Sequence, residues 1–147
     1  MSFVEYIEKE LKERGYRFTR PRKVVAEALG NTKKALSAYE IEKVLKLSAE
    51  KVDIVTIYRI LEVYKELNLI HESRDGYMAC SHMECETKSH CHHQIVCDNC
   101  HQVTELHLEE CGLVERVRSS FPKLIIKSHY VEITGVCEKC LGDTATI

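Results

Sequence analysis

Four helical segments and a hairpin, followed by a region rich in cysteine and histidine, predict an α+β protein of 147 residues. The helices and the hairpin indicate an N-terminal winged helix-turn-helix, and the second region indicates a small α/β domain with metal ligands. All eight cysteines lie at position 80 or later and all eight histidines at position 71 or later, so the composition changes sharply along the chain. We therefore expect a winged-helix domain at residues 1–82, a hinge at 83–92 and a metal-binding domain at 93–147.

The first three helices are predicted from the residues that start them. SFVE (2–5) and SAYE (37–40) are capping boxes, in which a serine is followed three residues later by a glutamate. Thr19 can cap a helix between them, with Pro21 tolerated in its first turn. Apolar residues follow each start at spacings of three and four, so each helix should bury one face.

The fourth helix and the hairpin complete the winged-helix outline. The helix is expected to begin near Asp53, and its apolar residues recur at helical spacing as far as residue 67. Two short extended runs follow, LIHES (69–73) and GYMAC (76–80), and the glycine at the turn between them tolerates a positive φ. Helices followed by such a hairpin are typical of DNA-binding winged helices.

In a winged helix, the helix before the hairpin enters the major groove of DNA. The outer face of this helix would present Thr56, Tyr58 and Arg59. Arg59 can bind a guanine edge or a phosphate, and Tyr58 can pack against a sugar or a thymine methyl group. The competing interpretation is an ordinary amphipathic helix in which Tyr58 packs into the core. Charge does not decide between them, because residues 1–80 carry 15 Lys and Arg against 13 Asp and Glu.

Two C-x-x-C pairs, at 97–100 and 137–140, are the strongest chemical signal in the chain. Each pair lets two thiolates reach one ion, and two pairs make the tetrahedral four-sulfur site of structural zinc. Between the pairs, residues 102–106 and 123–136 have strand composition and residues 108–120 have a helical pattern. The alternative use of such pairs is a redox dithiol. The predicted zinc ligands are Cys97, Cys100, Cys137 and Cys140.

Composition and motifs disfavour several functional classes. No apolar run approaches the roughly 18 residues that a membrane span needs, and the charged N-terminal segment does not resemble a secretory signal. We therefore expect a cytoplasmic protein with no membrane partner and no small-molecule substrate. A zinc enzyme would need an open coordination position beside a general base, for which Glu105 is the candidate, but the chain has no H-E-x-x-H motif. A thiol redox switch is the other alternative.

Several segments, taken together, resemble the ferric uptake regulator family. Their order and spacing carry the resemblance, in R-F-T-R-P-R (17–22), S-A-Y-E-I (37–41), T-I-Y-R-I-L (56–61), the two cysteine pairs and V-E-I-T-G-V-C (131–137). The resemblance implies a metal-dependent repressor, not an enzyme, that binds palindromic operator DNA as a homodimer. It also implies that the second domain serves for dimerisation and that the paired cysteines hold structural Zn2+.

Within this family, the sequence resembles the zinc uptake regulators more than the iron or peroxide sensors. Many iron and peroxide sensors carry H-x-H just before the first cysteine pair, and here those positions are His92 and Gln94. A further family histidine would fall on Ala35. A thiolate, two imidazoles and a carboxylate suit a second, regulatory Zn2+, whereas Fe2+ or Mn2+ would be the ion of the alternative branches. The sensor ligands that the zinc branch implies are His71, Cys80, His90 and Glu105.

Two ligand assignments stay open. In the loop 81–91, Cys85 could take the place of Cys80, and His92 could take the place of His90. A further family metal site would include two histidines of the second domain. The residues that match this site or lie near it are His93, His129, Cys91, Glu109, Glu110 and Cys111.

The resemblance also ranks the candidates for DNA contact. It implies principal contacts from Tyr39 and Arg59, and secondary contacts from Thr56 and Tyr58. The alternative role of Tyr39, which opens a helix, is packing against a neighbouring helix. Phosphate contacts position a protein on DNA without specifying its sequence. The residues expected to bind phosphates are Arg20 and Arg22.

Overall fold

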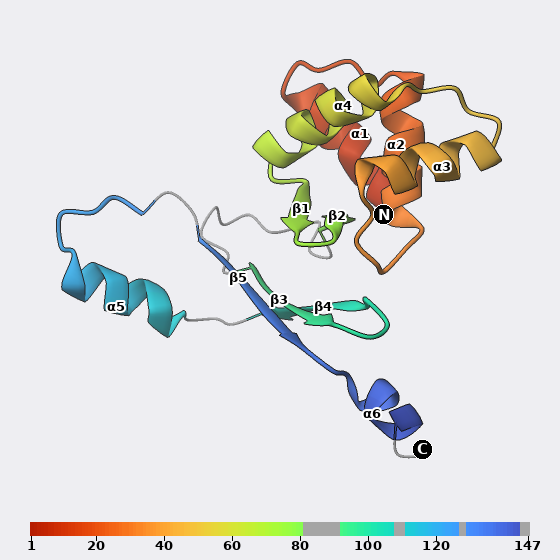
Figure 1. Ribbon diagram of the computed structural model, residues 1–147. Helices are drawn as coiled ribbons and strands as arrows, with labels where there is room; N and C mark the ends of the chain where they lie inside the picture. The colour runs from red at the N-terminus through yellow and green to blue at the C-terminus, as the bar shows by residue number, and fades with distance from the viewer. Residues whose placement is uncertain (81–91, 108–110, 127–128, 145–147) are drawn as a thin grey trace. The chain divides into compact units, whose positions relative to one another are not determined.

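The computed structural model describes residues 1–80, 92–107, 111–126 and 129–144 (Figure 1). The chain divides into two compact units, Met1–Glu84 and Cys85–Ile147. In the described ranges, the first unit contains four helices and a hairpin, and the second contains a three-stranded sheet and two short helices. None of these helices combines the length and the apolar character needed to cross a bilayer.

The starts of the helices in the first unit follow their capping residues. In both capping boxes, the serine hydroxyl accepts a hydrogen bond from the third helical amide, and the glutamate accepts one from the serine amide. Asp53 caps the fourth helix by accepting a hydrogen bond of 2.9 Å from the Thr56 amide. Thr19 precedes the second helix, but its side chain makes no capping hydrogen bond. The helices are α1 (Phe3–Glu13), α2 (Arg20–Gly30), α3 (Ala38–Leu47) and α4 (Ile54–Glu66).

The core of the first unit consists of the apolar faces that these helices turn toward one another. Tyr64 of α4 is fully buried, and its hydroxyl donates a hydrogen bond of 2.7 Å to the Arg22 carbonyl of α2. Burial raises the pKa of this phenol well above its usual range, so it stays a neutral donor. Each fully buried aliphatic side chain contributes about 1.5–3 kcal/mol. Those with almost no exposed surface include Ile7, Leu11, Leu29, Ile41, Ile57, Leu61 and Leu69.

The wing is an antiparallel hairpin of β1 (Ile70–Ser73) and β2 (Gly76–Ala79), joined by a two-residue loop. Gly76 has a φ of +136°, a conformation that residues with a Cβ rarely adopt. Leu36, just before α3, exchanges two backbone hydrogen bonds of 2.8 Å with Tyr77. These bonds attach the turn end of the wing to the segment that precedes α3 in the same unit.

Replacing Gly76 with alanine is expected to lower the free energy of unfolding of the first unit by about 1–3 kcal/mol. A Cβ at this position would overlap the Leu36 carbonyl and the Ser37 amide nitrogen, and the positive φ adds strain. Chemical denaturation followed by circular dichroism measures the loss. Gly15→Ala is the control, because its φ of +79° is also positive but no atom lies within 4 Å of its Cβ. Equal losses in the two variants would contradict the overlap.

The second unit is built on a sheet with the strand order β4-β3-β5. β3 (His92–Cys97) pairs antiparallel with β4 (Val103–His107) and parallel with β5 (Tyr130–Gly135). The helices α5 (Gly112–Ser120) and α6 (Glu138–Thr144) come before and after β5 in the chain. Because β3 and β5 run in parallel, the residues that follow them emerge at the same end of the sheet.

The predicted α+β fold class is confirmed, and the differences lie in the second unit. The strand expected at 102–106 is β4, shifted by one residue. The strand expected within residues 123–136 is β5, which is shorter than that range, because residues 121–126 form a turn and an irregular segment and β5 begins at Tyr130. The helix expected at 108–120 is described from Gly112. Two elements, β3 and α6, were not predicted.

Candidate metal centres

Four cysteines meet at one end of the three-stranded sheet. Cys97 ends β3 and lies opposite Gly135 of β5, so the chain leaving β5 brings Cys137 to the same end. Cys100 lies in the turn before β4, and Cys140 lies in α6. The four sulfur atoms all lie within 4.8 Å of one another. Parallel pairing of two strands has therefore joined the two predicted cysteine pairs.

The geometry of the four-cysteine cluster fits tetrahedral zinc. Zinc–sulfur bonds of about 2.3 Å in a regular tetrahedron would place the sulfur atoms about 3.8 Å apart. The Sγ atoms of Cys100 and Cys137 lie 3.8 Å apart. The spacing also exceeds the length of a disulfide bond, which is about 2.05 Å.

Backbone amides prepare one sulfur of this cluster for metal binding. The Cys137 amide donates a hydrogen bond of 3.3 Å to Cys97 Sγ. Amide donors from Cys100 and Cys137 lower the pKa of the Cys97 thiol to about 6. Hydrogen bonding to the Cys137 sulfur raises the pKa of the Cys140 thiol to about 12. A divalent cation at the centre of the cluster would favour the thiolate form of the cysteines that bind it.

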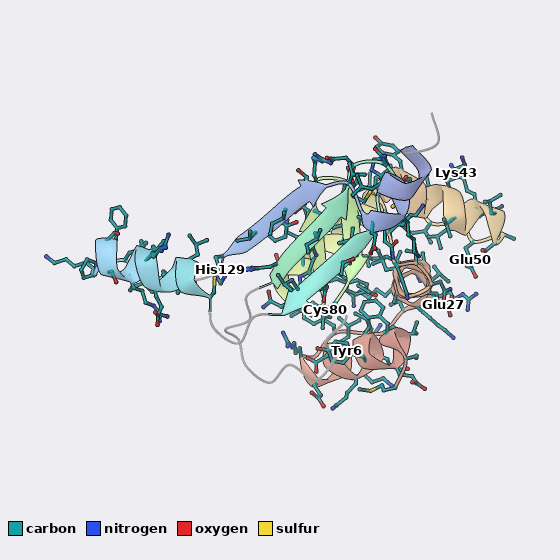
Figure 2. The ribbon with its side chains drawn as sticks, turned by 90° about the horizontal axis from the view of Figure 1, so that it is seen from below. Tyr6, Glu27, Lys43, Glu50, Cys80 and His129 are labelled. Carbon is teal, nitrogen blue, oxygen red and sulfur yellow. The ribbon has the colours of Figure 1, made fainter. Side chains whose placement is uncertain are left out.

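A second cluster in this unit joins His93, Cys111 and His129. His93 lies on β3, Cys111 is the residue before α5, and His129 is the residue before β5. The Sγ of Cys111 lies 3.4 Å from His93 Nε2, and the two imidazole rings are 5.9 Å apart at 80°. Figure 2 shows His129 at the start of β5, on the side from which α5 extends.

The burial of this second cluster is consistent with a metal-binding role. His93 and Cys111 are 7% and 8% exposed. The Nε2 atom of His129 is buried and has no hydrogen-bond partner among the described residues. Leaving such an atom unpaired costs about 1–3 kcal/mol, which an ion bound to it would remove. Two imidazoles and one thiol suit zinc, with one coordination position left for a further ligand.

The wing holds two of the predicted sensor ligands. His71 lies on β1, and the Cys80 amide donates a hydrogen bond of 3.3 Å to the Leu69 carbonyl, which extends the hairpin by one pair. Alternation along paired strands places His71 and Cys80 on the same face of the hairpin. They are 9% and 6% exposed. Of the other predicted sensor ligands, Glu105 lies on β4 of the second unit, and His90 is outside the described residues.

Three other predicted ligands lie at or before the start of β3. Cys85 and Cys91 are outside the described residues, and only the backbone of His92 is described, at the start of β3. Of the predicted alternative ligands, the structure therefore brings His93, Cys111 and His129 together.

The predicted DNA-contact residues of α3 and α4 are largely exposed. Tyr58 is 41% exposed, so the alternative that it packs into the core is wrong, and Tyr39 is 66% exposed. Arg59 is exposed as well. The Thr56 hydroxyl donates a hydrogen bond of 2.7 Å to Asp53, so this side chain supports the start of α4.

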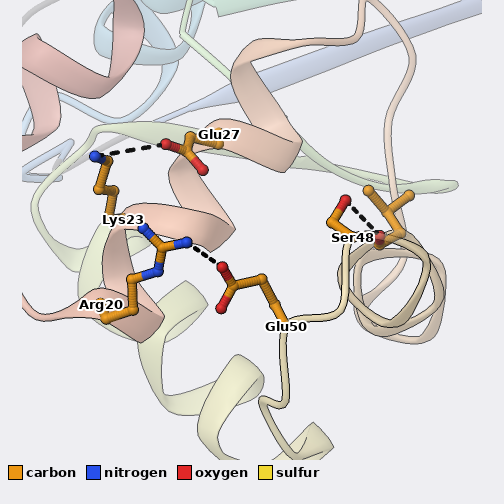
Figure 3. Close-up of polar contacts among 6 residues, drawn as sticks. Arg20, Lys23, Glu27, Ser48 and Glu50 are labelled. Carbon is orange, nitrogen blue, oxygen red and sulfur yellow. Dashed lines mark hydrogen bonds and ion pairs between the residues drawn. The ribbon is translucent and has the colours of Figure 1, made fainter.

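The two arginines expected to bind phosphates both have partners within the protein. Arg20 forms an ion pair with Glu50 (Figure 3). Arg22 donates a hydrogen bond of 2.5 Å to the Arg17 carbonyl and lies 5.4 Å from the centre of the Tyr16 ring. A phosphate would have to compete with these contacts.

A groove of about 520 Å³ lies between the start of α2 and α4. Arg17 and Arg59 line it, and both are exposed. Arg17 was not among the predicted contacts. The signal that could have identified it is the first arginine of R-F-T-R-P-R (17–22).

Comparison with known proteins identifies the chain's relatives. A model of the ferric uptake regulator family matches residues 13–134. The chain belongs to this family. The peroxide operon regulator of Bacillus subtilis (strain 168) is 31% identical over 130 residues, which is 88% of each chain. The crystal structure of holo XcZur has 26% identity and a TM-score of 0.75, covering 95% of this chain and 97% of that one. A zinc uptake regulator complexed with zinc and DNA has a TM-score of 0.78 at 24% identity, covering 97% and 95%.

Membership of the ferric uptake regulator family decides the functional class. The chain is a metal-responsive transcriptional regulator and not an enzyme, so the zinc-enzyme alternative is wrong. The predicted family is confirmed, and the likeness to the holo XcZur structure agrees with the zinc uptake branch.

At position 94, where sensors with the H-x-H motif carry their second histidine, this chain has a glutamine side chain. Gln94 is fully buried on the central strand, and Glu105 and Glu132 lie opposite it on β4 and β5. Its Oε1 accepts a hydrogen bond of 3.0 Å from the Tyr130 hydroxyl. A neutral amide held in this way is a poor substitute for an imidazole ligand.

Proposed function

We propose that this family member is a zinc-sensing repressor that acts in the cytoplasm, binds palindromic operator DNA as a homodimer and controls metal uptake genes. The observation that carries the proposal is the buried Cys80 thiol on the same wing face as His71. Thiolate and imidazole ligands suit zinc, whereas Mn2+ favours carboxylates and peroxide-sensing Fe2+ sites favour nitrogen and oxygen ligands.

The proposed sensor links the two units across the proposed hinge at 83–92. His71 and Cys80 would hold the ion from the wing, and Glu105 would hold it from β4, with His90 as the fourth ligand. Bound zinc supplies a cross-link that fixes the wing relative to the second unit. The separation of the two recognition helices in a dimer is then fixed, as two half-sites on DNA require. A coupling of about 1–3 kcal/mol would change DNA affinity about 5–150-fold.

An uncovered apolar face on the sheet supports the homodimer. Ile95, Leu106 and Ile133 lie on this face and are 39%, 38% and 49% exposed. No residue of α5 is buried, so this helix does not cover them with a packed face of its own. A second copy of the chain would cover this surface, and a two-fold dimer would match the symmetry of a palindromic site.

DNA recognition is proposed to depend on Arg59. Arg59→Ala is expected to weaken operator binding at low salt by about 1–3 kcal/mol, because one bidentate base contact would be lost. Fluorescence anisotropy with labelled operator and with scrambled DNA measures the change. Lys123→Ala removes the same charge from an exposed position of the second unit and serves as the control. Wild-type affinity in Arg59→Ala would show that another residue of α4 reads the DNA.

The alternative is an iron- or peroxide-responsive regulator of the same family. Its support is the peroxide operon regulator, which is 31% identical to this chain. Two residues count against it, because that interpretation would need histidines where the chain has Gln94 and Ala35.

Operator binding with separately titrated metals distinguishes these functions. Purified dimer that retains its structural zinc would be titrated anaerobically with Zn2+, Fe2+ and Mn2+ in the presence of labelled operator. The proposal expects zinc to raise DNA affinity at the lowest free concentration of the three ions. If iron or manganese acts first and zinc has no further effect, zinc sensing is refuted and the alternative is favoured.

A further inference from the structure

We propose that Glu50 limits the affinity of this regulator for DNA of any sequence, because it competes with DNA phosphates for Arg20. The inference rests on the DNA binding of the proposed function and adds a residue that weakens the electrostatic part of the affinity. That part comes from phosphate contacts, which do not depend on the base sequence. Glu50 would therefore act equally on operator and on non-operator DNA.

Of the two arginines expected to bind phosphates, Arg20 is the one with a carboxylate as its partner. The partners of Arg22 are a backbone carbonyl and the ring of Tyr16, both of which are uncharged. Arg20 instead forms its ion pair with Glu50, which lies 30 positions away in the sequence. A guanidinium beside a carboxylate attracts a further anion less strongly, because the negative charge repels that anion.

The backbone after α3 fixes the direction in which Glu50 leaves the helix. Ala49 has a φ of +59°, in the left-handed region. Its amide donates a hydrogen bond of 3.2 Å to the Lys46 carbonyl, and the next amide, of Glu50, donates one of 2.9 Å to the Leu45 carbonyl. These two bonds form a Schellman motif, with alanine where glycine is usual. Figure 3 shows the Glu50 carboxylate turned toward Arg20 at the start of α2.

The exposure of the two side chains allows a phosphate to reach the pair. The Arg20 side chain is 63% exposed, whereas that of Glu50 is 23% exposed. A guanidinium has five N–H donors, and one carboxylate accepts at most a pair of them in the bidentate arrangement. Arg20 therefore has donors left for a phosphate that arrives from the solvent. Such a phosphate must either displace Glu50 or bind next to its negative charge.

The place of Arg20 in the fold favours contact with DNA that is bound to α4. Its neighbours in the sequence, Thr19 and Pro21, line the groove between the start of α2 and α4. Arg59, the proposed base-reading residue, lines the same groove. The backbone of DNA held by Arg59 would thus pass near the start of α2. Removing the charge of Glu50 should free Arg20 for one of its phosphates.

Anisotropy titrations of zinc-loaded protein with a labelled duplex of scrambled sequence test the proposal. Glu50→Gln should bind this duplex about two- to fivefold more tightly than wild type at low salt, which is the size of one exposed ion pair. The slope of log affinity against log salt should become steeper by about 0.9, as expected for one additional phosphate contact. An ion pair with a purely structural role would leave this slope unchanged, so wild-type affinity and slope in Glu50→Gln would refute the proposal.

Glu8→Gln is the matched control, because it removes a carboxylate of the same unit. Glu8 forms an ion pair with Lys12 within α1 and does not line the groove. This variant should bind the duplex as wild type does. An equal gain in both variants would show that loss of any carboxylate raises DNA affinity, which would contradict a specific role for Glu50. Thermal unfolding followed by circular dichroism verifies that each variant is folded.

A double substitution decides whether Glu50 acts through Arg20. In the Arg20→Gln background, Glu50→Gln should add nothing to the affinity or to the salt slope. The same gain with and without Arg20 would mean that Glu50 repels DNA directly, and the proposal would be overturned while the DNA-binding function stands. If zinc-loaded wild-type protein binds neither the scrambled duplex nor operator DNA, the proposed function itself fails, and this inference with it.

Discussion

Replacing Cys137 with serine is expected to release the structural zinc and unfold the second unit, leaving a monomer. An ion bound to the four sulfurs would hold the ends of β3 and β5 together, because each strand is followed or ended by one cysteine pair. Structural zinc sites contribute about 10–16 kcal/mol in small zinc domains, which equals or exceeds the whole stability of a typical domain. Zinc content by mass spectrometry and mass by sedimentation velocity measure the outcome.

The same result is expected for Cys97→Ser, because the Cys97 sulfur belongs to the same cluster and accepts a hydrogen bond from the Cys137 amide. Cys111→Ser is the matched control, because it removes a thiol of the same unit from outside the four-cysteine cluster. The control should keep the structural zinc and the folded sheet. A stable Cys137→Ser dimer with wild-type zinc content would contradict the structural role of this site.

Replacing Cys80 with serine is expected to abolish zinc-dependent operator binding while the structural zinc remains. The thiol is buried on the wing beside His71, in the first unit, whereas the four-cysteine cluster lies entirely in the second. The loss should equal the coupling between metal and DNA, about 5–150-fold in affinity. Anisotropy titrations at fixed free Zn2+ measure it.

Ser73→Ala is the control for Cys80→Ser, since Ser73 is another small buried residue of the same hairpin. It should leave the zinc response intact. If Cys80→Ser retains the wild-type zinc dependence, Cys80 is not a sensor ligand, and Cys85 becomes the candidate.

Local rules were sufficient to predict the first unit. The capping boxes at Ser2 and Ser37 start their helices because each satisfies two backbone groups within four residues. The wing follows in the same way from the glycine that its turn requires at position 76. In such elements, the residues that decide the structure are close together in the sequence.

The second unit depends on pairings between distant residues, and there prediction was weaker. Strand β3 was missed because its histidines and its cysteine were considered only as ligands. The cysteine pairs were recognised from their spacing, but the grouping of His93 with Cys111 and His129 depends on the parallel pairing of β3 and β5. The ion pair of Arg20 with Glu50 likewise joins residues that the sequence separates by 30 positions.

The most direct measurement is operator affinity of one dimer preparation with and without regulatory metal. The structural zinc would be kept in both states, and a chelator would hold free zinc at a negligible level in one of them. Zinc-loaded protein should bind labelled operator at least about fivefold more tightly than protein with the sensor empty. Equal affinity in both states, with the chelator present throughout the second titration, would contradict the account.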